Sequence, residues 1–189
     1  PQGLISLFSG NDNSTSGMQR FIDSLNDFFL NSDRRRGSAF PGPYYWHGNE
    51  PDIQSVYLFN SVHRPDLTQK WVKWIMTTKY SNTSQALDGD DDAGTLSAWY
   101  VLSSLGFFPI AGTTQYMIGS PLFAQAQFYL DGHLVDIKTE NFSKTNDFVE
   151  SVSINGKTLH DPWFDHSEIA QGATIVFHMS PQPVTWKGD

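Results

Sequence analysis

The chain has 189 residues, of which 39% are hydrophobic, 14% aromatic and 17% charged, and its formal net charge is −8. This composition is typical of a folded chain, because disordered segments are poorer in aromatic residues and richer in charge. The acidic balance repels phosphate backbones and anionic lipid headgroups, and there is no apolar run long enough to span a bilayer, which argues against nucleic acid and membrane as partners. Cysteine is absent, so disulfides contribute nothing to stability.

The first two thirds of the sequence carry helical periodicity. We expect four helices, which begin at about Gly17, Asn49, Pro65 and Gly94. Ser16 is the predicted N-cap of the first helix, which runs to Leu30, and Gly106 is the predicted C-cap of the fourth. In the second helix Asn49 is the predicted cap, with Pro51 close to the first helical position.

After Pro109 the apolar period changes from helical to alternating. Asp131-Gly132 and Asn155-Gly156 each separate two alternating segments, which predicts two tight hairpins. A last strand is expected over 174–179. We place the boundary near Ile118, with a helical region over 1–118 and strands of a β-sandwich over 119–189.

The densest chemical feature is the acidic run over 88–94, which places four aspartates within five residues. One interpretation is a helix N-terminus, whose partial positive charge stabilises carboxylates. A calcium loop of the EF-hand type fails, because Ala93 and Trp99 stand where that loop needs glycine and glutamate. A third interpretation is a general base, since crowded carboxylates raise one another's proton affinity.

A second candidate region, over 44–52, sets aromatic rings beside amide and carboxylate groups, as a sugar site requires. The candidate substrate contacts are Trp46, His47, Asn49, Glu50 and Asp52. The competing interpretation is a helix cap followed by ordinary core aromatics, with His47 as a structural residue.

Three glycosylation acceptor sequences begin at Asn13, Asn82 and Asn141, and together they favour a secreted or extracellular protein. The start at Pro1 reads as the interior of a longer protein, so we expect a processed or truncated fragment.

Several motifs, in order along the chain, resemble glycoside hydrolase family 92. They are Gly48-Asn49-Glu50-Pro51-Asp52, Tyr57-Leu58-Phe59-Asn60, Thr68-Gln69-Lys70-Trp71-Val72, Gly89-Asp90-Asp91-Asp92, Ser97-Ala98-Trp99-Tyr100-Val101, Leu105-Gly106-Phe107-Phe108-Pro109 and Gly119-Ser120-Pro121-Leu122-Phe123. The resemblance implies a calcium-dependent exo-α-mannosidase that inverts the anomeric centre, with an (α/α)6 barrel packed on a β-sandwich. Residues 1–118 would be the C-terminal half of that barrel.

The resemblance also implies roles for individual residues. Asp90 and Asp92 match the general-base side of the site, while Asn49 and Glu50 resemble sugar or calcium contacts. The family's general acid is a glutamate in a Glu-Gly-Asn motif, expected shortly before Pro1 and absent here. The expected reaction is hydrolysis of terminal α-mannosidic bonds, of the α-1,2 type, in mannose-rich glycans, with the acid supplied by an N-terminal part on a separate or missing polypeptide.

Two alternatives stay open. One is a non-catalytic carbohydrate- or calcium-binding module, which the missing acid favours. The other is a different (α/α)6 glycosidase, for example one that acts on glucosides. Half a barrel would leave apolar helix faces uncovered, which favours the fragment of an α-mannosidase over an independent module.

Overall fold

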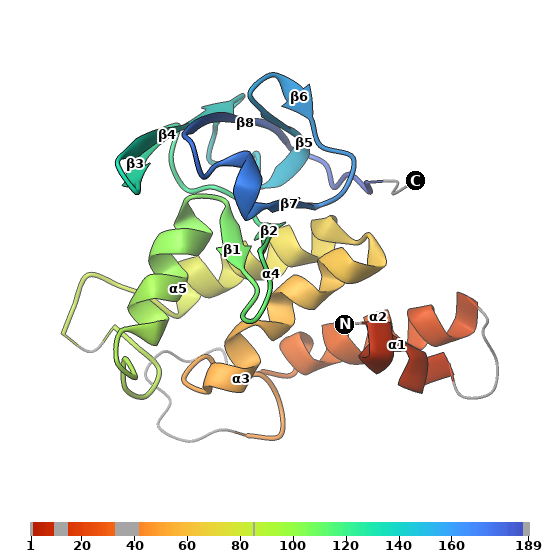
Figure 1. The fold of residues 1–189 in the computed structure, drawn as a ribbon. Helices are drawn as coiled ribbons and strands as arrows, with labels where there is room; N and C mark the ends of the chain where they lie inside the picture. The colour runs from red at the N-terminus through yellow and green to blue at the C-terminus, as the bar shows by residue number, and fades with distance from the viewer. Residues whose placement is uncertain (1, 10–14, 33–41, 85, 187–189) are drawn as a thin grey trace.

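The computed structural model describes residues 2–9, 15–32, 42–84 and 86–186. The α-helices form one layer, and two β-sheets from the later part of the chain lie against it (Figure 1). The chain is therefore a mixed α and β structure, as the sequence predicts. Within the ranges just given, no helix combines the length and the apolar character that a bilayer crossing requires.

The helical layer follows the apolar periodicity of the sequence. Its elements are α1 (Gln2–Ser9), α2 (Thr15–Leu30), α3 (Glu50–Ile53), the 3-10 helix η1 (Ser55–Val62), α4 (Pro65–Thr78) and α5 (Thr95–Ser104). The expected starts at Pro65 and beside Gly94 are confirmed, as is the end of α2 at Leu30.

Two predictions about helix starts need correction. Helix α2 already includes Thr15, so Ser16 lies inside the helix and is not its N-cap. The second predicted helix is a single α-helical turn, α3, followed by the 3-10 helix η1. Asn49 does occupy the N-cap position of α3, with Pro51 in the first turn as predicted, but its side chain makes no capping hydrogen bond. The apolar spacing at Ile53, Val56 and Tyr57 is compatible with both helix types, and all three side chains are buried.

The strands form a three-stranded sheet and a five-stranded sheet. The smaller has the order β1 (Phe107–Pro109), β2 (Gln115–Ile118) and β7 (Trp163–Asp165). The larger has the order β3 (Gln125–Leu130), β4 (His133–Glu140), β8 (Ala173–Ser180), β5 (Phe148–Ile154) and β6 (Lys157–Thr158), and a short 3-10 helix, η2 (His166–Glu168), follows β7. Strands β4 and β8 pair parallel, and the other pairs are antiparallel.

Both predicted hairpins are present. Asp131 and Gly132 have φ angles of 48° and 84°, and Asn155 and Gly156 have 52° and 81°. Positive φ at both central residues defines the tight turn whose twist matches the flanking strands, and Asn-Gly and Asp-Gly adopt it at low cost. The sequence therefore fixes the β3–β4 and β5–β6 connections locally.

The small sheet joins two hydrophobic cores. Along β1, Phe107 packs into the core of the large sheet and Phe108 into the helical core, and along β2, Met117 and Ile118 divide in the same way. This alternation follows from the two-residue period of a strand. Strand β1 begins at Phe107, before the change of period expected at Pro109, because it directly follows the turn at Gly106.

Candidate active site

Two loops far apart in sequence meet at the end of the helical layer that faces away from the large sheet (Figure 1). One precedes α3 and the other precedes α5. A Cβ added to Gly48 would lie 2.5 Å from the carbonyl oxygen of Asp88 and 2.5 Å from the ring of Trp46. Only glycine allows this approach, so the backbone of one candidate region packs directly on the other.

Glu50 and Asp92 form a carboxyl pair where the loops meet. Both side chains are exposed, and they lie close enough for one to donate a hydrogen bond to the other when it carries a proton. The pKa of Asp92 is raised, first because part of its hydration is lost and then because Glu50, Asp90 and Asp91 add negative charge. A raised pKa improves a carboxylate as a proton acceptor, so the pair has the character of an acid–base group.

The backbone around Asp92 is unusual. Asp92, Ala93 and Gly94 have φ angles of 47°, 57° and 90°, three left-handed residues in succession. Glycine adopts this conformation freely and aspartate tolerates it, whereas for Ala93 it costs about 1–3 kcal/mol. Such a conformation persists only where neighbouring contacts hold it. It separates the backbone of Asp92 from the regular helix, which starts at Thr95.

Asp91 supplies one of these contacts. Its two carboxylate oxygens accept the backbone N–H of Ser97 at 2.8 Å and the Ser97 hydroxyl at 2.7 Å. These bonds lower the pKa of Asp91. The first N–H groups of a helix have no partner within the helix, so Asp91, which precedes the N-cap residue Gly94, supplies an acceptor to the first turn of α5. For this one aspartate the contact agrees with the interpretation of the acidic run as a helix N-terminus.

A buried ion pair lies beneath the loops. Lys79 Nζ lies 2.9 Å from Asp88 Oδ2, and neither side chain is exposed. Lys79 directly follows α4, and its backbone N–H donates to the carbonyl of Ile75 at 2.8 Å. The first aspartate of the acidic run is therefore a structural anchor and does not belong to the exposed cluster.

His47 lies in the core and has no exposed surface. Its Nδ1 lies 2.5 Å from the Tyr45 hydroxyl, its Nε2 lies 2.5 Å from the Tyr80 hydroxyl, and Tyr80 donates to the carbonyl of Leu96 at 2.8 Å. Because the Tyr80 proton goes to Leu96, His47 donates from Nε2 to Tyr80 and accepts at Nδ1 from Tyr45.

The environment of His47 keeps the ring neutral. Burial, and then the charge of Lys79, lower its pKa to about 3. The edge of the ring packs on Trp99, with centroids 4.7 Å apart. A buried, neutral ring cannot reach a substrate at the surface, so this geometry does not agree with the predicted contact of His47 with substrate. The ring instead packs beneath the loop before α3, in the core.

Trp46 and Asn49 lie in the turn before α3, and Asp52 lies within α3 itself. The Trp46 backbone N–H donates to Asp52 Oδ2 at 3.2 Å, and the Asn49 N–H donates to the Trp46 carbonyl at 3.1 Å. The Asn49 side chain also hydrogen-bonds to Asp52, whose pKa is raised chiefly by burial. Asp52 thus braces the turn. Trp46 and Asn49 are half-buried, and Glu50, which follows Asn49, is exposed.

The same residues bear on the expected calcium site. Carboxylate and amide oxygens, as in Glu50 and Asn49, are the donors that calcium prefers, but it takes about six to eight of them. Among the described residues there is no group of three or more His, Cys, Asp or Glu side chains that could hold a metal ion. The donors fit calcium in kind, and they supply only part of a ligand shell.

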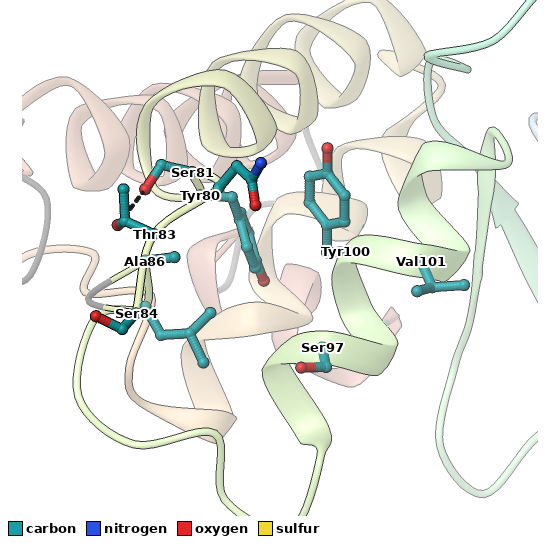
Figure 2. A pocket seen from close by; sticks show the side chains of 10 residues that line it. Tyr80, Ser81, Thr83, Ser84, Ala86, Ser97, Tyr100 and Val101 are labelled. Carbon is teal, nitrogen blue, oxygen red and sulfur yellow. Dashed lines mark hydrogen bonds between the residues drawn. The ribbon is translucent and has the colours of Figure 1, made fainter.

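A cavity of about 610 Å³ opens between α5 and the loop that follows α4 (Figure 2). Tyr80 and Tyr100 line it together with Ser97, the residue that Asp91 binds. The predicted sugar contacts and the Asp90–Asp92 pair are not among its lining residues, so it lies beside the candidate site.

The predicted glycosylation residues differ in what the structure says of them. Asn82 is exposed in the loop after α4, at the cavity just described, and Asn141 is exposed in the turn that follows β4. Asn13 lies outside the described residues. Both described positions are accessible for modification.

The glycosyl hydrolase family 92 catalytic domain matches residues 1–181. The chain belongs to this family. A family 92 α-mannosidase from Bacteroides thetaiotaomicron is 32% identical, with a TM-score of 0.79 over 89% of this chain and 22% of that one. Its complex with mannoimidazole gives 31% identity and a TM-score of 0.78 over 89% of this chain and 23% of that one.

Two further relatives widen the comparison. A family 92 inverting mannosidase from Bacteroides thetaiotaomicron VPI-5482 is 25% identical, with a TM-score of 0.67 over 95% of this chain and 24% of that one. An uncharacterized secreted glycosidase from Arthroderma benhamiae is 24% identical over 143 residues, which are 74% of this chain. The chain spans 19% of the length of that relative.

The structure shows two residues next to the candidate site that the sequence does not indicate, Lys79 and Tyr80. Lys79 and Tyr80 connect both loops to the helical core, yet nothing in the sequence marks them, because they lie at the end of an ordinary amphipathic helix. The burial of Asp88 was also missed, since its neighbours in the acidic run are exposed or half-buried.

Proposed function

We propose that this chain is part of an α-mannosidase and that its Asp90–Asp92 segment supplies the general base of an inverting hydrolysis. The observation that carries the proposal is the contact between Glu50 and Asp92, which brings the two chemically dense motifs of the sequence to one exposed place. The family membership and the likeness to α-mannosidases support the same assignment.

The proposed mechanism follows from inversion. A water molecule attacks the anomeric carbon from the face opposite the leaving oxygen, and the base removes a proton from that water. Asp92 is suited to this step because its pKa is raised, in part by the neighbouring Asp90. An acid about 6.5–9.5 Å from the base protonates the leaving oxygen.

We infer that the acid comes from another part of the family 92 domain, since the chain spans about a fifth of the relatives that it matches. The proposed whole is an (α/α)6 barrel, half of it from residues 1–118, packed against a β-sandwich to which residues 119–189 contribute. The N-terminal part would be the partner of this chain, whether on the same polypeptide or on a separate one.

Sugar contacts are proposed for Trp46, Asn49 and Glu50, which are half-buried or exposed at the rim of the loop before α3. Trp46 offers an aromatic face, and Asn49 and Glu50 offer hydrogen-bonding groups beside Asp92. In the same position Asn49 and Glu50 would contribute oxygens to a calcium ion, which would polarise the sugar hydroxyls. Asp52 and His47 would contact no sugar. Asp52 holds the loop backbone by accepting the Trp46 N–H, and His47 holds the buried side of the loop through its hydrogen bond with Tyr80.

The proposed substrates are terminal α-mannosidic bonds, of the α-1,2 type, in mannose-rich glycans. We also propose that the protein is secreted. The acceptor sequences at Asn82 and Asn141 and the likeness to a secreted glycosidase support this location.

The test uses the full-length protein on an aryl α-mannoside and a mannobiose, with NMR of the first product. Asp90→Asn and Asp92→Asn are each expected to lower kcat by about 10²- to 10⁴-fold, and the first product is expected to be β-mannose. Asp131→Asn is the matched control, since Asp131 is exposed and its φ of 48° almost equals that of Asp92. Release of α-mannose, or normal rates for both loop variants, would refute the base assignment.

A further inference from the structure

The ion pair of Lys79 and Asp88 is entirely buried, with 2.9 Å between Nζ and Oδ2. Removing two charges from water costs as much as, or more than, their attraction returns, so apolar side chains of similar size often give an equally stable core. Stability alone therefore does not explain why this core contains charges. Its place in the fold offers another reason.

The pair joins two elements that end at the candidate site. Lys79 is held by α4 through its backbone bond to Ile75, and Asp88 opens the segment that leads to Asp92. The carbonyl oxygen of Asp88 packs on Gly48, so anchoring Asp88 also fixes the distance between this segment and the loop that carries Glu50.

The segment is anchored again at its other end. Asp91 is bound to Ser97 at the start of α5. Asp92 and Ala93 directly follow Asp91 with a left-handed backbone, and Asp92 forms the carboxyl pair with Glu50 of the other loop. A left-handed backbone at non-glycine residues persists only where contacts on both sides hold it. The ion pair of Asp88 with Lys79 provides such a contact on the N-terminal side of Asp92 and Ala93.

The surroundings of Lys79 add to this arrangement. Its ammonium group lies 5.9 Å from the Trp74 ring centroid, and its charge acts on His47, which supports the loop before α3. Tyr80, the next residue, hydrogen-bonds to both His47 and Leu96 of α5. The end of α4 is thus connected to both loops of the site and to α5.

We propose that the Lys79–Asp88 ion pair is a positioning element that sets Asp92 against Glu50, and that it is dispensable for the stability of the fold. The inference rests on the proposed function in so far as Asp92 is the base. It assigns to Lys79 and Asp88 no contact with substrate.

The test replaces both charges at once in the full-length protein, as Lys79→Met with Asp88→Leu, which leaves no unpaired buried charge. The melting temperature is expected to stay close to that of the parent protein. We expect kcat to fall by about 10- to 100-fold with a smaller change in KM, because a displaced catalytic group loses rate more than binding. Amide hydrogen exchange over residues 89–96 is expected to accelerate by at least about tenfold.

The matched control is the partly exposed pair of Lys73, in α4, and Asp147, directly before β5, whose Nζ and Oδ1 lie 3.3 Å apart. Lys73→Met with Asp147→Asn is expected to leave kcat and the exchange over 89–96 unchanged. If the apolar pair at 79 and 88 does not fold, Lys79→Gln with Asp88→Asn is measured by the same criteria.

Unchanged exchange, or unchanged kcat in a folded double variant, would overturn the proposal, as would a failure of both double variants to fold. Asp92→Asn in the same assay separates this result from the proposed function. A normal rate for Asp92→Asn refutes the base assignment. In that case the hydrogen exchange over residues 89–96 alone tests whether the Lys79–Asp88 pair positions this segment.

Discussion

Between pH 8 and pH 5, acidification is expected to destabilise this protein in part through His47. Its ring is fully buried, and burial together with the charge of Lys79 lowers its pKa to about 3 from an ordinary value of 6.5. As pH falls through 6.5 the unfolded chain gains a proton on this ring, whereas the folded chain stays neutral until about pH 3. The contribution is fully present above pH 6.5 and is lost progressively below it.

The magnitude follows from the same two values. At pH 5, an unfolded pKa of 6.5 and a folded pKa of about 3 give a loss of about 2 kcal/mol relative to pH 8. Near pH 3 the loss approaches about 4 to 5 kcal/mol. Because a domain is stable by only about 5–15 kcal/mol, a loss of 2 kcal/mol is readily measured.

The assay is urea unfolding of the parent protein and of His47→Gln at several pH values between 5 and 8. His47→Gln is expected to be less stable at pH 8 and to depend less on pH, so the two curves converge towards pH 5. His133→Gln is the control, since His133 is exposed at the β3–β4 turn and its variant should follow the parent curve. Parallel curves for the parent and His47→Gln would refute the reasoning.

Three further predictions concern the loops and the surface. Asp91→Ala should lower the melting temperature by a few degrees, because the first turn of α5 loses its cap, and an unchanged melting temperature would contradict this role. Glu50→Gln should lower the pKa of Asp92, because the negative charge of Glu50 that raises it is removed and the Gln amide can donate to the Asp92 carboxylate. The acidic limb of the pH–rate profile should then move to lower pH, and an unmoved limb would show that Asp92 is not the base. Asn82 and Asn141 should carry glycans in material from a secreting eukaryote, as peptide masses before and after deglycosylation would report, and unmodified peptides at both sites would count against secretion.

What the sequence predicts well is what depends on neighbours in the chain. Asp131-Gly132 and Asn155-Gly156 specify their hairpins because few residue pairs tolerate two positive φ angles. The start of α4 at Pro65 has a similarly local cause. By contrast, η1 has apolar residues that fit an α-helix equally well, and its 3-10 form depends on packing that the spacing does not report.

For the candidate site too, the sequence predicts only what is local. It identifies the two segments that are dense in chemical groups, but it does not distinguish the roles of the individual aspartates within the acidic run. Asp88 is buried with Lys79, Asp91 caps α5, and Asp92 meets Glu50 across the loops. These differences depend on contacts between residues far apart in sequence.

This division of roles bears on the simplest explanation of the acidic run, which is that a helix N-terminus attracts carboxylates. Asp91 and Asp88 are explained by the fold, one as a cap and the other as an anchor. Asp90 and Asp92 are not: within the described part of the chain no hydrogen bond or ion pair engages the carboxylate of Asp90, and Asp92 lies beside another carboxyl group on a left-handed backbone. Repulsion and an unfavourable backbone both oppose folding. The stability of α5 therefore does not explain Asp90 and Asp92, and their arrangement agrees with the proton transfer proposed above.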